Sequence, residues 1–561
     1  MSRLRKCLLI LGCLPASAAF AQTPPSTANP GRIDERFNPP AVPQSVPEIS
    51  IPEPAFGAPP QATADTQFEL IGVVVDGSTV FTPTDLAPLY QNLIGKKVTL
   101  ADMYRLRDAI TAKYRAAGYI LSQASLPPQS IAGGVVHLKM IEGYIDHITV
   151  EDAAHDPRGL IAATAANITR SRPLRAKDLE RSVLLINDIP GVSASTVLMP
   201  SDTEPGASDL VVTVTRHSVS GQIGADNRGS QAIGMAQIFA GLSLNSVLGL
   251  DEQTSVLFAT TSQTRELAYI SVHHDEVLNP QGLRLIVSGS YSRSQPGGAI
   301  AALDARGRGT IVSVELIDPI IRSRAKTLKL GLGFTVANTS TDLLSVRFSQ
   351  DRVRYASASV AYDFADEALG PRTPATTLLR VELDQGLKIF SASLNGTPLL
   401  SRANGRSDYT LVSGELTRIQ SLGGNVSVAV SAAGQYAFVP LLSSQQFGLG
   451  GRRFGRGYEP SELTGDNGVS FSVEPRFDLS RYIPSGRPQL YAFYEGGTVW
   501  QKQPLVGQAP RESLSSVGGG VRFQLGPYLR ADLGAAKPLT HDIASRGNRK
   551  VRFLFDLTAA F

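Results

Sequence analysis

The sequence predicts an all-β transmembrane barrel of roughly sixteen antiparallel strands, preceded by two small α+β domains. Three observations lead to this fold class. Short segments of alternating polarity fill the chain from about residue 217 to its end. Helical periodicity is confined to residues 67–216, and an aromatic residue, Phe561, ends the last alternating segment.

The bulk composition supports this prediction. The chain has 561 residues and a formal net charge of +4, and its mean hydropathy is close to zero. The length predicts more than one domain. Beyond the N-terminus no apolar run reaches the roughly 18 residues that a spanning helix needs. The nearly balanced charge gives no indication of a nucleic-acid partner.

Residues 1–21 have the three parts of a secretory signal peptide. Basic residues at 3–6 precede a short apolar stretch, and Ala-Phe-Ala at 19–21 forms a cleavage site. A lipoprotein box at 10–13 is the weaker alternative. Both cysteines of the chain lie within this segment, so we expect the mature chain to have no disulfide, no thiol catalysis and no cysteine-bound zinc.

Residues 22–66 are dense in proline and predict an extended linker. Only residues 32–37 could form a turn or two of helix. This short helix is a possible plug for the barrel, and the sequence leaves open whether it plugs.

Residues 67–143 predict the first α+β domain, in the order β-α-α-β-β. Strands are expected at 68–75, 120–126 and 135–141 because these segments are rich in β-branched residues or alternate in polarity. Residues 144–216 repeat the order with different residues, which indicates a repeat of architecture. Its expected strands are 145–150, 193–199 and 210–215, and its expected helices are 157–166 and 176–188.

One helix of the first domain has both of its ends marked. Thr99 can act as its N-cap, with Asp102 at the capping-box position in place of the usual Glu or Gln. Gly118 is expected to end it as the C′ residue. Between them apolar residues recur at helical spacing: Met103, Leu106, Ile110 and Tyr114.

From about residue 217 the alternating segments are mostly about 9 to 13 residues long, the length of a tilted strand that crosses a membrane. Leu328, Leu330 and Leu332, for example, alternate with Lys329 and Gly331. The polar face carries Arg, Lys, Asp, Gln and Gly, as the wall of a wet lumen would. A soluble β-sandwich or propeller is the alternative. It accounts less well for the length of the strands.

The last segment of the chain presents one apolar face: Val551, Phe553, Phe555, Leu557, Ala559 and Phe561. Such a terminal strand is typical of outer-membrane barrels. We expect Phe553, Phe555 and Phe561 to close the barrel against outer-membrane lipid and to be recognised by the barrel assembly machinery. In lipid every backbone group must be paired, so closure is obligatory.

The chain resembles the outer-membrane transporters of two-partner secretion over nearly all of its mature length. In the first domain the resemblance rests on a GY…LPxQ…EG pattern: Gly118-Tyr119, Leu126-Pro127-Pro128-Gln129 and Glu142-Gly143. In the second it rests on residues 172–174, 178–181 and 184–191, and in the barrel on residues 226–229. In that family the two small domains are called POTRA domains.

The sharpest motif is Arg456-Gly457-Tyr458, in a long loop at 439–467. It resembles the VRGY signature of the wider BamA superfamily, with Gly455 where Val is usual. The resemblance implies a loop that folds back into the lumen, where its Arg contacts a carboxylate on the barrel wall. Glu495, in Phe-Tyr-Glu-Gly-Gly at 493–497, stands where the superfamily has Asp, and Glu474 is a second candidate.

The resemblance implies export of one large secreted partner: a haemolysin, an adhesin or a contact-dependent toxin. The POTRA domains would capture the unfolded partner in the periplasm, with Tyr119, Pro127, Gln129, Glu142 and Gly143 as candidate docking residues. A membrane-protein insertase, a passive porin and a surface adhesin are the rival functions. The count of two POTRA domains favours secretion.

The sequence contains no Walker A motif, no G-x-S-x-G elbow and no H-E-x-x-H motif. His273 and His274 are adjacent and therefore poorly spaced to ligate one metal from one strand face. We therefore expect no catalytic residue, no metal site and no cofactor, and partner translocation without nucleotide hydrolysis.

Overall fold

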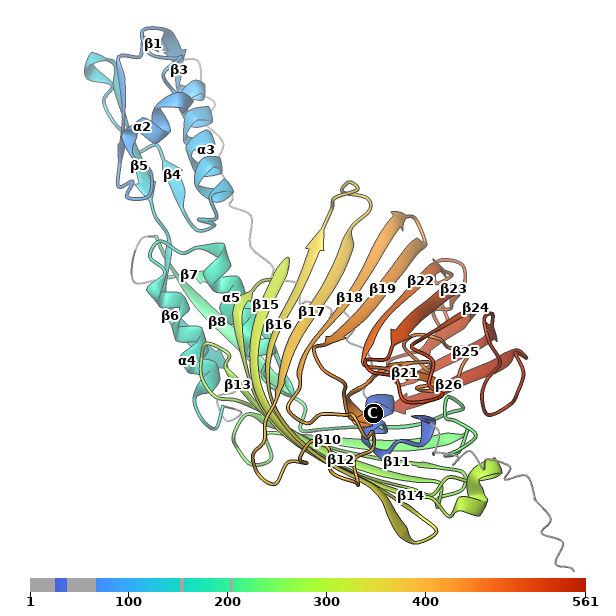
Figure 1. The fold of residues 1–561 in the computed structure, drawn as a ribbon. Coiled ribbons are helices and arrows are strands. Elements are labelled where there is room, and N and C mark those ends of the chain that lie inside the picture. Colours follow the sequence, from blue (N-terminus) through green and yellow to red (C-terminus); the bar gives the residue numbers. More distant parts are fainter. Residues whose placement is uncertain (1–25, 38–66, 152–155, 202–203, 205) are drawn as a thin grey trace, which may run out of the picture.

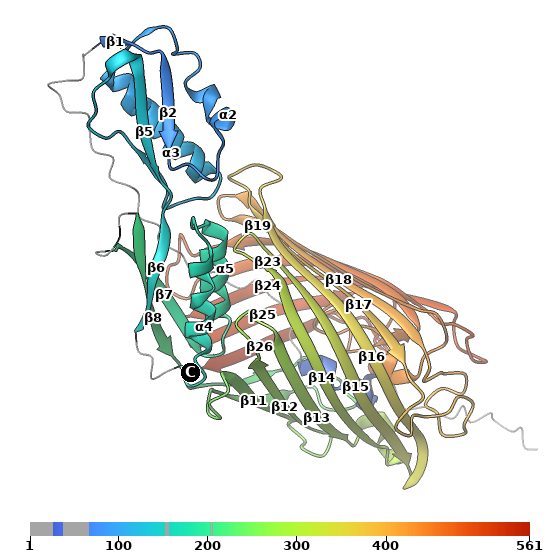
Figure 2. The ribbon, with the colours of Figure 1, turned by 90° about the vertical axis from the view of Figure 1, so that its left-hand side faces the viewer.

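The computed structural model describes residues 26–37, 67–151, 156–201, 204 and 206–561. The signal peptide predicted at 1–21 and most of the predicted linker at 22–66 lie outside these residues. Figures 1 and 2 show two small domains stacked at one end of a large barrel, with a short N-terminal segment inside it. In the described part of the chain, no helix is long and apolar enough to span a membrane.

Within residues 219–560 the structure has a closed barrel of sixteen antiparallel strands, as predicted. Because each strand is hydrogen-bonded on both sides, the wall presents no free backbone edge to lipid. The strands are β9 Val219–Asp226, β10 Gln237–Asn245, β11 Glu252–Thr261, β12 Leu267–Val277, β13 Arg284–Ser294, β14 Arg306–Arg322, β15 Lys326–Leu343, β16 Val346–Asp366, β17 Ala375–Gly386, β18 Thr410–Gly423, β19 Val426–Ala437, β22 Asn467–Asp478, β23 Gln489–Trp500, β24 Arg511–Leu525, β25 Leu529–Pro538 and β26 Arg552–Ala560.

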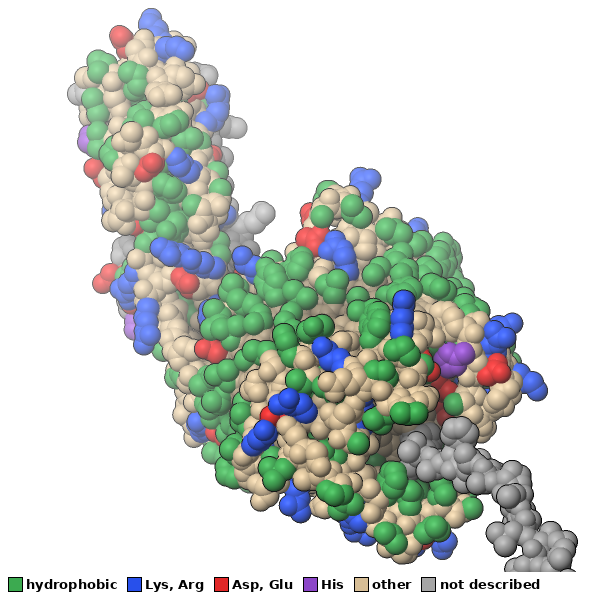
Figure 3. All heavy atoms as spheres, viewed as in Figure 1, with side chains coloured by type: hydrophobic (Ala, Val, Ile, Leu, Met, Phe, Trp, Pro, Cys, Tyr) green, Lys and Arg blue, Asp and Glu red, His purple; other side chains and the backbone are tan. Residues whose placement is uncertain are grey.

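The outer face of the barrel is apolar, as the alternating segments predicted. Leu330 and Leu332 on β15 point outward and are exposed, whereas Gly331 between them is buried. On the terminal strand Phe553 is 78% exposed, as expected of a residue whose side chain faces lipid. Figure 3 shows hydrophobic side chains crowding the side of the barrel nearest the small domains.

The two ends of the barrel differ. Short turns join β14 to β15 and β18 to β19 at the end that carries the small domains. The longer connections, at 295–305, 387–409, 438–466 and 539–551, lie at the opposite end. This asymmetry is typical of outer-membrane barrels, in which the periplasmic turns are short.

The first small domain has a three-stranded sheet in the order β2-β5-β4, with β2 parallel and β4 antiparallel to β5. The predicted capping box is confirmed: Thr99 and Asp102 cap α3, and Gly118 follows that helix with a φ of +91°. The elements are β1 Gln67–Glu69, β2 Gly72–Asp76, α2 Pro83–Leu86, β3 Lys97–Thr99, α3 Leu100–Ala116, β4 Gln123–Ser125 and β5 Val135–Ile141.

The prediction of a single strand at 68–75 is wrong. The chain changes partner at Leu70, which is completely buried and donates its N–H to the Lys96 carbonyl. Ile71 donates instead to Gly134. β1 therefore pairs with β3, a strand that we did not predict, while β2 pairs with β5.

The second small domain has the same sheet topology as the first. Its sheet order is β6-β8-β7, with β6 parallel and β7 antiparallel to β8. The elements are β6 Tyr144–Glu151, α4 Leu160–Ala166, α5 Ala176–Asn187, β7 Val192–Pro200 and β8 Ala207–Arg216. α4 begins three residues later than predicted because Gly159 adopts a left-handed φ of +68°, which interrupts any helix before it.

Ion pairs fix this second domain to the short turns of the barrel. Asp188, which follows α5, accepts two hydrogen bonds from Arg322 on β14, at 2.7 and 2.8 Å. Arg158 binds Glu276 on β12 at 2.9 Å. Arg181 on α5 donates to the Pro319 carbonyl at 3.0 Å. A bidentate arginine–carboxylate contact restrains orientation as well as distance, so the domain is held at the mouth of the barrel.

Candidate functional site in the barrel lumen

The connection between β19 and β22, residues 438–466, folds back into the barrel, and we call it the lumen loop. It contains a turn at Ser443–Gln445 and a two-stranded hairpin of β20 Phe447–Leu449 and β21 Leu463–Gly465. Leu449 and Leu463 pack against Val499 and Leu514 on the inner wall. This apolar contact anchors the hairpin and brings the tip of the loop, with the Arg-Gly-Tyr motif, against the wall.

Arg456 at the tip contacts both candidate carboxylates. Its Nε lies 3.0 Å from Glu495 Oε2 on β23, and its Nη1 lies 2.7 Å from Glu474 Oε2 on β22. Its guanidinium carbon also lies 3.5 Å from the centroid of the Phe493 ring. Cation–π contact and charge-assisted hydrogen bonds thus act on one side chain.

The two carboxylates have different surroundings. Glu495 is completely buried and also accepts hydrogen bonds from the Arg456 backbone N–H and from Ser516, the latter at 2.8 Å. Glu474 is shared among Arg456, Arg522 and Arg476, the last two at 2.7 and 2.8 Å. Because such charges have left bulk water, removing one partner would leave the others poorly compensated.

The residues beside Arg456 explain the glycines of the motif. Gly455, where the related signature has Val, adopts a left-handed φ of +86° that favours glycine. A Cβ on Gly457 would lie 2.8 Å from the Ser516 Cβ and 2.9 Å from the Pro538 nitrogen, so the loop backbone touches the wall there. Tyr458 is completely buried, and its hydroxyl lies 3.0 Å from Thr540 Oγ1.

Two further acidic residues position the loop and were missed in the sequence. Asp466 is completely buried and accepts backbone hydrogen bonds from Leu441 at 2.8 Å and Lys502 at 2.7 Å. Glu459 accepts from Gln231 N at 3.1 Å and Ser545 Oγ at 2.7 Å. Their only signal in the sequence is a carboxylate in the same long loop as the motif.

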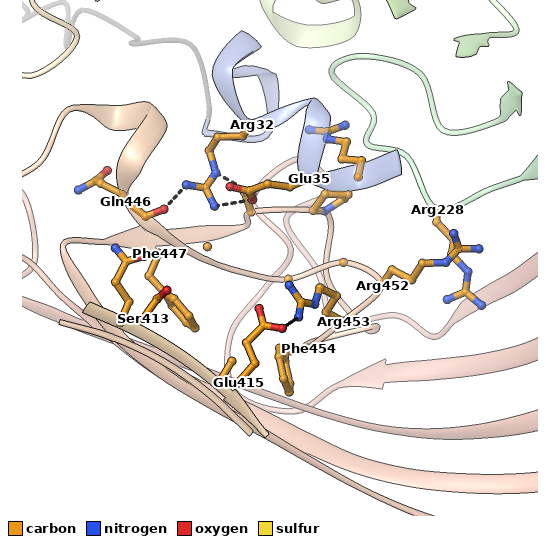
Figure 4. A pocket seen from close by; sticks show the side chains of 18 of the residues that line it. Arg32, Glu35, Arg228, Ser413, Glu415, Gln446, Phe447, Arg452, Arg453 and Phe454 are labelled. Atoms are coloured by element: carbon orange, nitrogen blue, oxygen red, sulfur yellow. Dashed lines mark hydrogen bonds and ion pairs between the residues drawn. The ribbon is translucent and has the colours of Figure 1, made fainter. Parts of the chain in front are cut away.

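The N-terminal segment lies inside the lumen against the lumen loop (Figures 1 and 4). It consists of two single turns, Ser26–Ala28 and Pro30–Arg32, and of α1 Asp34–Phe37. Arg32 is 2% exposed, and its Nε donates to Ser461 Oγ at 3.0 Å. On the opposite side Tyr269 of β12 donates to Asp34 at 2.6 Å and stacks on Phe37.

The segment and the loop therefore lie side by side within the lumen. A cavity of about 290 Å³ lies between them and the wall, lined among others by Arg32, Arg452, Arg453 and Glu415 (Figure 4). Cavities of this size hold at most one small molecule.

In the first domain the side chain of Gln129 makes the hydrogen bonds that a backbone residue of an extended β4 would make with β5. Pro127 lies where β4 would continue beside His137 of β5, and it has no N–H to donate. The Gln129 side chain makes both bonds instead, donating to the His137 carbonyl at 2.6 Å and accepting from its N–H at 2.8 Å. Both candidate docking residues thus have a role within the sheet.

The other three docking candidates also have contacts within the chain. Glu142 accepts from the backbone of Thr79 at 2.7 Å and from the Tyr114 hydroxyl at 2.7 Å. A Cβ on Gly143 would lie 2.5 Å from the Leu121 carbonyl. Tyr119 packs edge-on against Tyr114. That these residues bind a partner stays a prediction.

The terminal Phe561 lies at the barrel closure. It exchanges two backbone hydrogen bonds with Gly221 on β9, at 3.0 and 2.9 Å. Its ring lies directly over Gly221, where any Cβ would collide with it. Phe553 and Phe555 face outward on the same strand. The last residue therefore extends the pairing that closes the barrel.

Fold and lumen site together define a class: an outer-membrane β-barrel with a periplasmic domain and a loop held inside its pore. The comparisons are specific. Residues 68–143 match the POTRA domain, ShlB-type, and residues 206–523, more than half of the chain, match the haemolysin secretion/activation protein family ShlB/FhaC/HecB. The chain belongs to this family. It is an outer-membrane transporter of two-partner secretion, which moves a secreted partner protein across that membrane.

Individual relatives agree with this assignment. The heme/hemopexin transporter protein HuxB of Haemophilus influenzae (strain 86-028NP) is 24% identical, over 86% of each chain. The outer membrane transporter CdiB of Escherichia coli (strain 536) is 27% identical, over 44% of this chain and 42% of the relative. The solved structure of CdiB from Escherichia coli is similar in fold, with a TM-score of 0.71 and 20% identity, over 90% of this chain and 93% of that one.

Replacing Glu142 with Gln should destabilise the first domain by about 1–2 kcal/mol, since charge-assisted hydrogen bonds would become neutral ones. Partial burial acts to raise the pKa of Glu142, but hydrogen bonds from Thr79 and Tyr114 outweigh it and hold this pKa below its usual value. The wild-type domain should therefore be more stable than the Glu142→Gln variant at pH values above the ordinary pKa of Glu. This difference in stability should vanish as the pH falls through the lowered pKa of Glu142.

Amide hydrogen exchange of β5 in the intact protein, measured as a function of pH, checks this expectation. Glu69→Gln is the matched control, because Glu69 is exposed in the same domain. Equal protection of β5 in the wild type and the Glu142→Gln variant at neutral pH would contradict it.

Proposed function

We propose that the chain captures an unfolded partner protein in the periplasm and passes it through the lumen beside the Arg456 loop. The observation that carries this proposal is the way the lumen is filled: by two elements held through polar contacts rather than by covalent bonds. Arginine–carboxylate contacts of this kind can break and re-form. The sequence offers no nucleotide-binding motif, so we propose that folding of the partner outside the cell biases the passage.

We further propose that residues 144–216 are a second POTRA domain. Its sheet repeats the topology of the first, with the same parallel and antiparallel pairings. The full division we propose is a signal peptide at 1–21, a linker with a plug segment at 22–66, POTRA domains at 67–143 and 144–216, and the barrel from 217 to 561.

An edge strand of the second domain supports partner capture by strand addition. β7 lies at the edge of its sheet. Val197 and Met199, on the face of β7 that points away from the domain core, are 55% and 47% exposed. An extended chain that adds to such an edge gains backbone hydrogen bonds and a place for alternate apolar side chains.

The names of the relatives support a proposal about the class of the exported partner. Relatives carry the names of heme/hemopexin, haemolysin and CdiB transporters. By analogy we propose that this chain exports a large haemolysin, adhesin or contact-dependent toxin. Outer-membrane lipid and the barrel assembly machinery are proposed as further partners, through the outward phenylalanines of β26.

Replacing Arg456 with Ala should reduce secretion of the partner at least several-fold while the barrel still assembles, because the tip of the loop loses its contacts with Glu474 and Glu495. Secreted partner is measured in the medium, and the transporter in outer-membrane fractions. Arg453→Ala is the matched control, since Arg453 lies in the same loop but pairs with Glu415 on β18. Undiminished export by the Arg456→Ala variant would refute the role of this contact.

Introducing Lys at both Val197 and Met199 should weaken capture of the partner at β7, because two charges would replace apolar side chains beside the proposed pairing edge. Binding of the purified partner N-terminal region to the transporter is the measurement. Thr149→Lys adds a charge to β6, at the opposite edge of the same sheet, and should change binding little. Equal losses at both edges would argue against docking on β7.

A further inference from the structure

A row of three aspartates crosses the place where the barrel closes. Asp532 on β25 lies opposite Asp556 on β26, and Asp556 lies opposite Asp226 on β9. Residues in register on neighbouring strands point to the same face of the sheet. Asp226 is 4% exposed, and the side chains of Asp532 and Asp556 are 22% and 15% exposed. The row therefore concentrates negative charge on the inner wall.

The register makes the contact across the closure especially close. Gly221 and Phe561 exchange two backbone hydrogen bonds, and Asn227 donates to Phe555. The pair Asp226–Asp556 lies between such positions and is a non-hydrogen-bonded pair, in which opposing side chains approach most closely. Like charges directly opposite one another destabilise strand pairing.

This closure is also the shortest of its neighbourhood. β9 and β26 share five residue pairs, whereas β9 pairs with β10, and β25 with β26, over eight each. Beyond the pair Asp226–Asp556, the side chain of Asn227 connects the two strands by donating to the Phe553 carbonyl at 2.8 Å. Because the closure is short and places carboxylates opposite one another, positive charge beside them would stabilise it.

One of the arginines that supplies this charge belongs to the lumen loop. Arg452, four positions before Arg456, forms an ion pair with Asp556. Arg452 and Asp226 also line the same cavity, together with Arg228. Arg228 itself donates its backbone N–H to Asp226 at 2.9 Å and lies 3.5 Å from Asp532. Figure 4 shows Arg452 extending from the loop toward Arg228.

We infer that Arg452 is a positioning residue that couples the lumen loop to the closure of the barrel. While the loop is seated, Arg452 pairs with Asp556 of β26 and so offsets the charge that faces Asp226 of β9. When the loop moves away, Asp226 and Asp556 face each other with less counter-charge, and the closure loosens. The consequence for transport rests on the proposed movement of the loop, but the charge coupling does not and is tested without any exported partner.

The experiment uses the full-length transporter purified from outer membranes in detergent. The readout is the midpoint temperature at which the barrel loses its compact electrophoretic form. Arg452→Gln should shift this midpoint downward, and adding Asp556→Asn should reverse the shift, since it removes the opposed charge. Arg453→Gln, one residue further along, loses a pair with Glu415 on β18, away from the closure, and should leave the midpoint unchanged.

A disulfide between β9 and β26 tests whether Arg452→Gln lowers the midpoint temperature by weakening the pairing of these two strands. Gln222 and Ala560 form another non-hydrogen-bonded pair between β9 and β26, and the chain has no cysteine beyond residue 13. Oxidation of the Gln222→Cys/Ala560→Cys pair should abolish the deficit of Arg452→Gln. A wild-type midpoint in Arg452→Gln, no reversal by Asp556→Asn, or a deficit that survives the disulfide would each overturn the inference.

Discussion

A β-barrel in lipid must pair every backbone group, and this constraint determines where the rest of the protein can act. The wall has no free edge, so a lumen is the space left for a transported chain. In the structure that space is occupied by two elements of the same polypeptide. Both are held by arginines: Arg456 binds Glu474 and Glu495 on the wall, and Arg32 binds Ser461 of the lumen loop. These contacts hold both elements within the lumen.

Arginine suits this role for physical reasons. Its guanidinium stays charged, spreads several donors over a plane and stacks on aromatic rings. Arg456 uses all three properties, with two carboxylates and the Phe493 ring. The same residue type joins the second small domain to the barrel, where Arg322 binds Asp188. One chemistry thus holds the loop, the N-terminal segment and the periplasmic domain in a single arrangement without disulfides.

Much of this architecture could be predicted from local patterns. Alternating polarity gave the barrel, and the Thr99–Asp102 capping box gave the start of α3, because both signals depend on neighbours in the sequence. The division of residues 68–75 into two strands could not be predicted, since it depends on Lys96 and Gly134, which are distant in the chain.

The lumen site, like the fold, could be predicted only in part. The Arg-Gly-Tyr motif identified the tip of the loop, and the segment at 493–497 identified one carboxylate. The sequence does not distinguish Glu474 from Glu495 as the partner of Arg456, and the structure pairs Arg456 with both. The roles of Asp466 and Arg452 depend on strand register and on the path of the loop through the lumen. Neither leaves a pattern in the linear sequence.

A disulfide between the N-terminal segment and the barrel wall would test whether the segment must leave the lumen during transport. An ideal Cβ on Gly307 of β14 would lie 3.3 Å from the Pro30 Cβ, close to the separation that a disulfide requires. The double variant Pro30→Cys/Gly307→Cys should therefore tether the segment to the wall under oxidising conditions. We expect oxidation to stop export of the partner and a reductant to restore it, while each single cysteine has no effect. Normal export by the fully oxidised double variant would show that the segment can stay in the lumen while the partner passes.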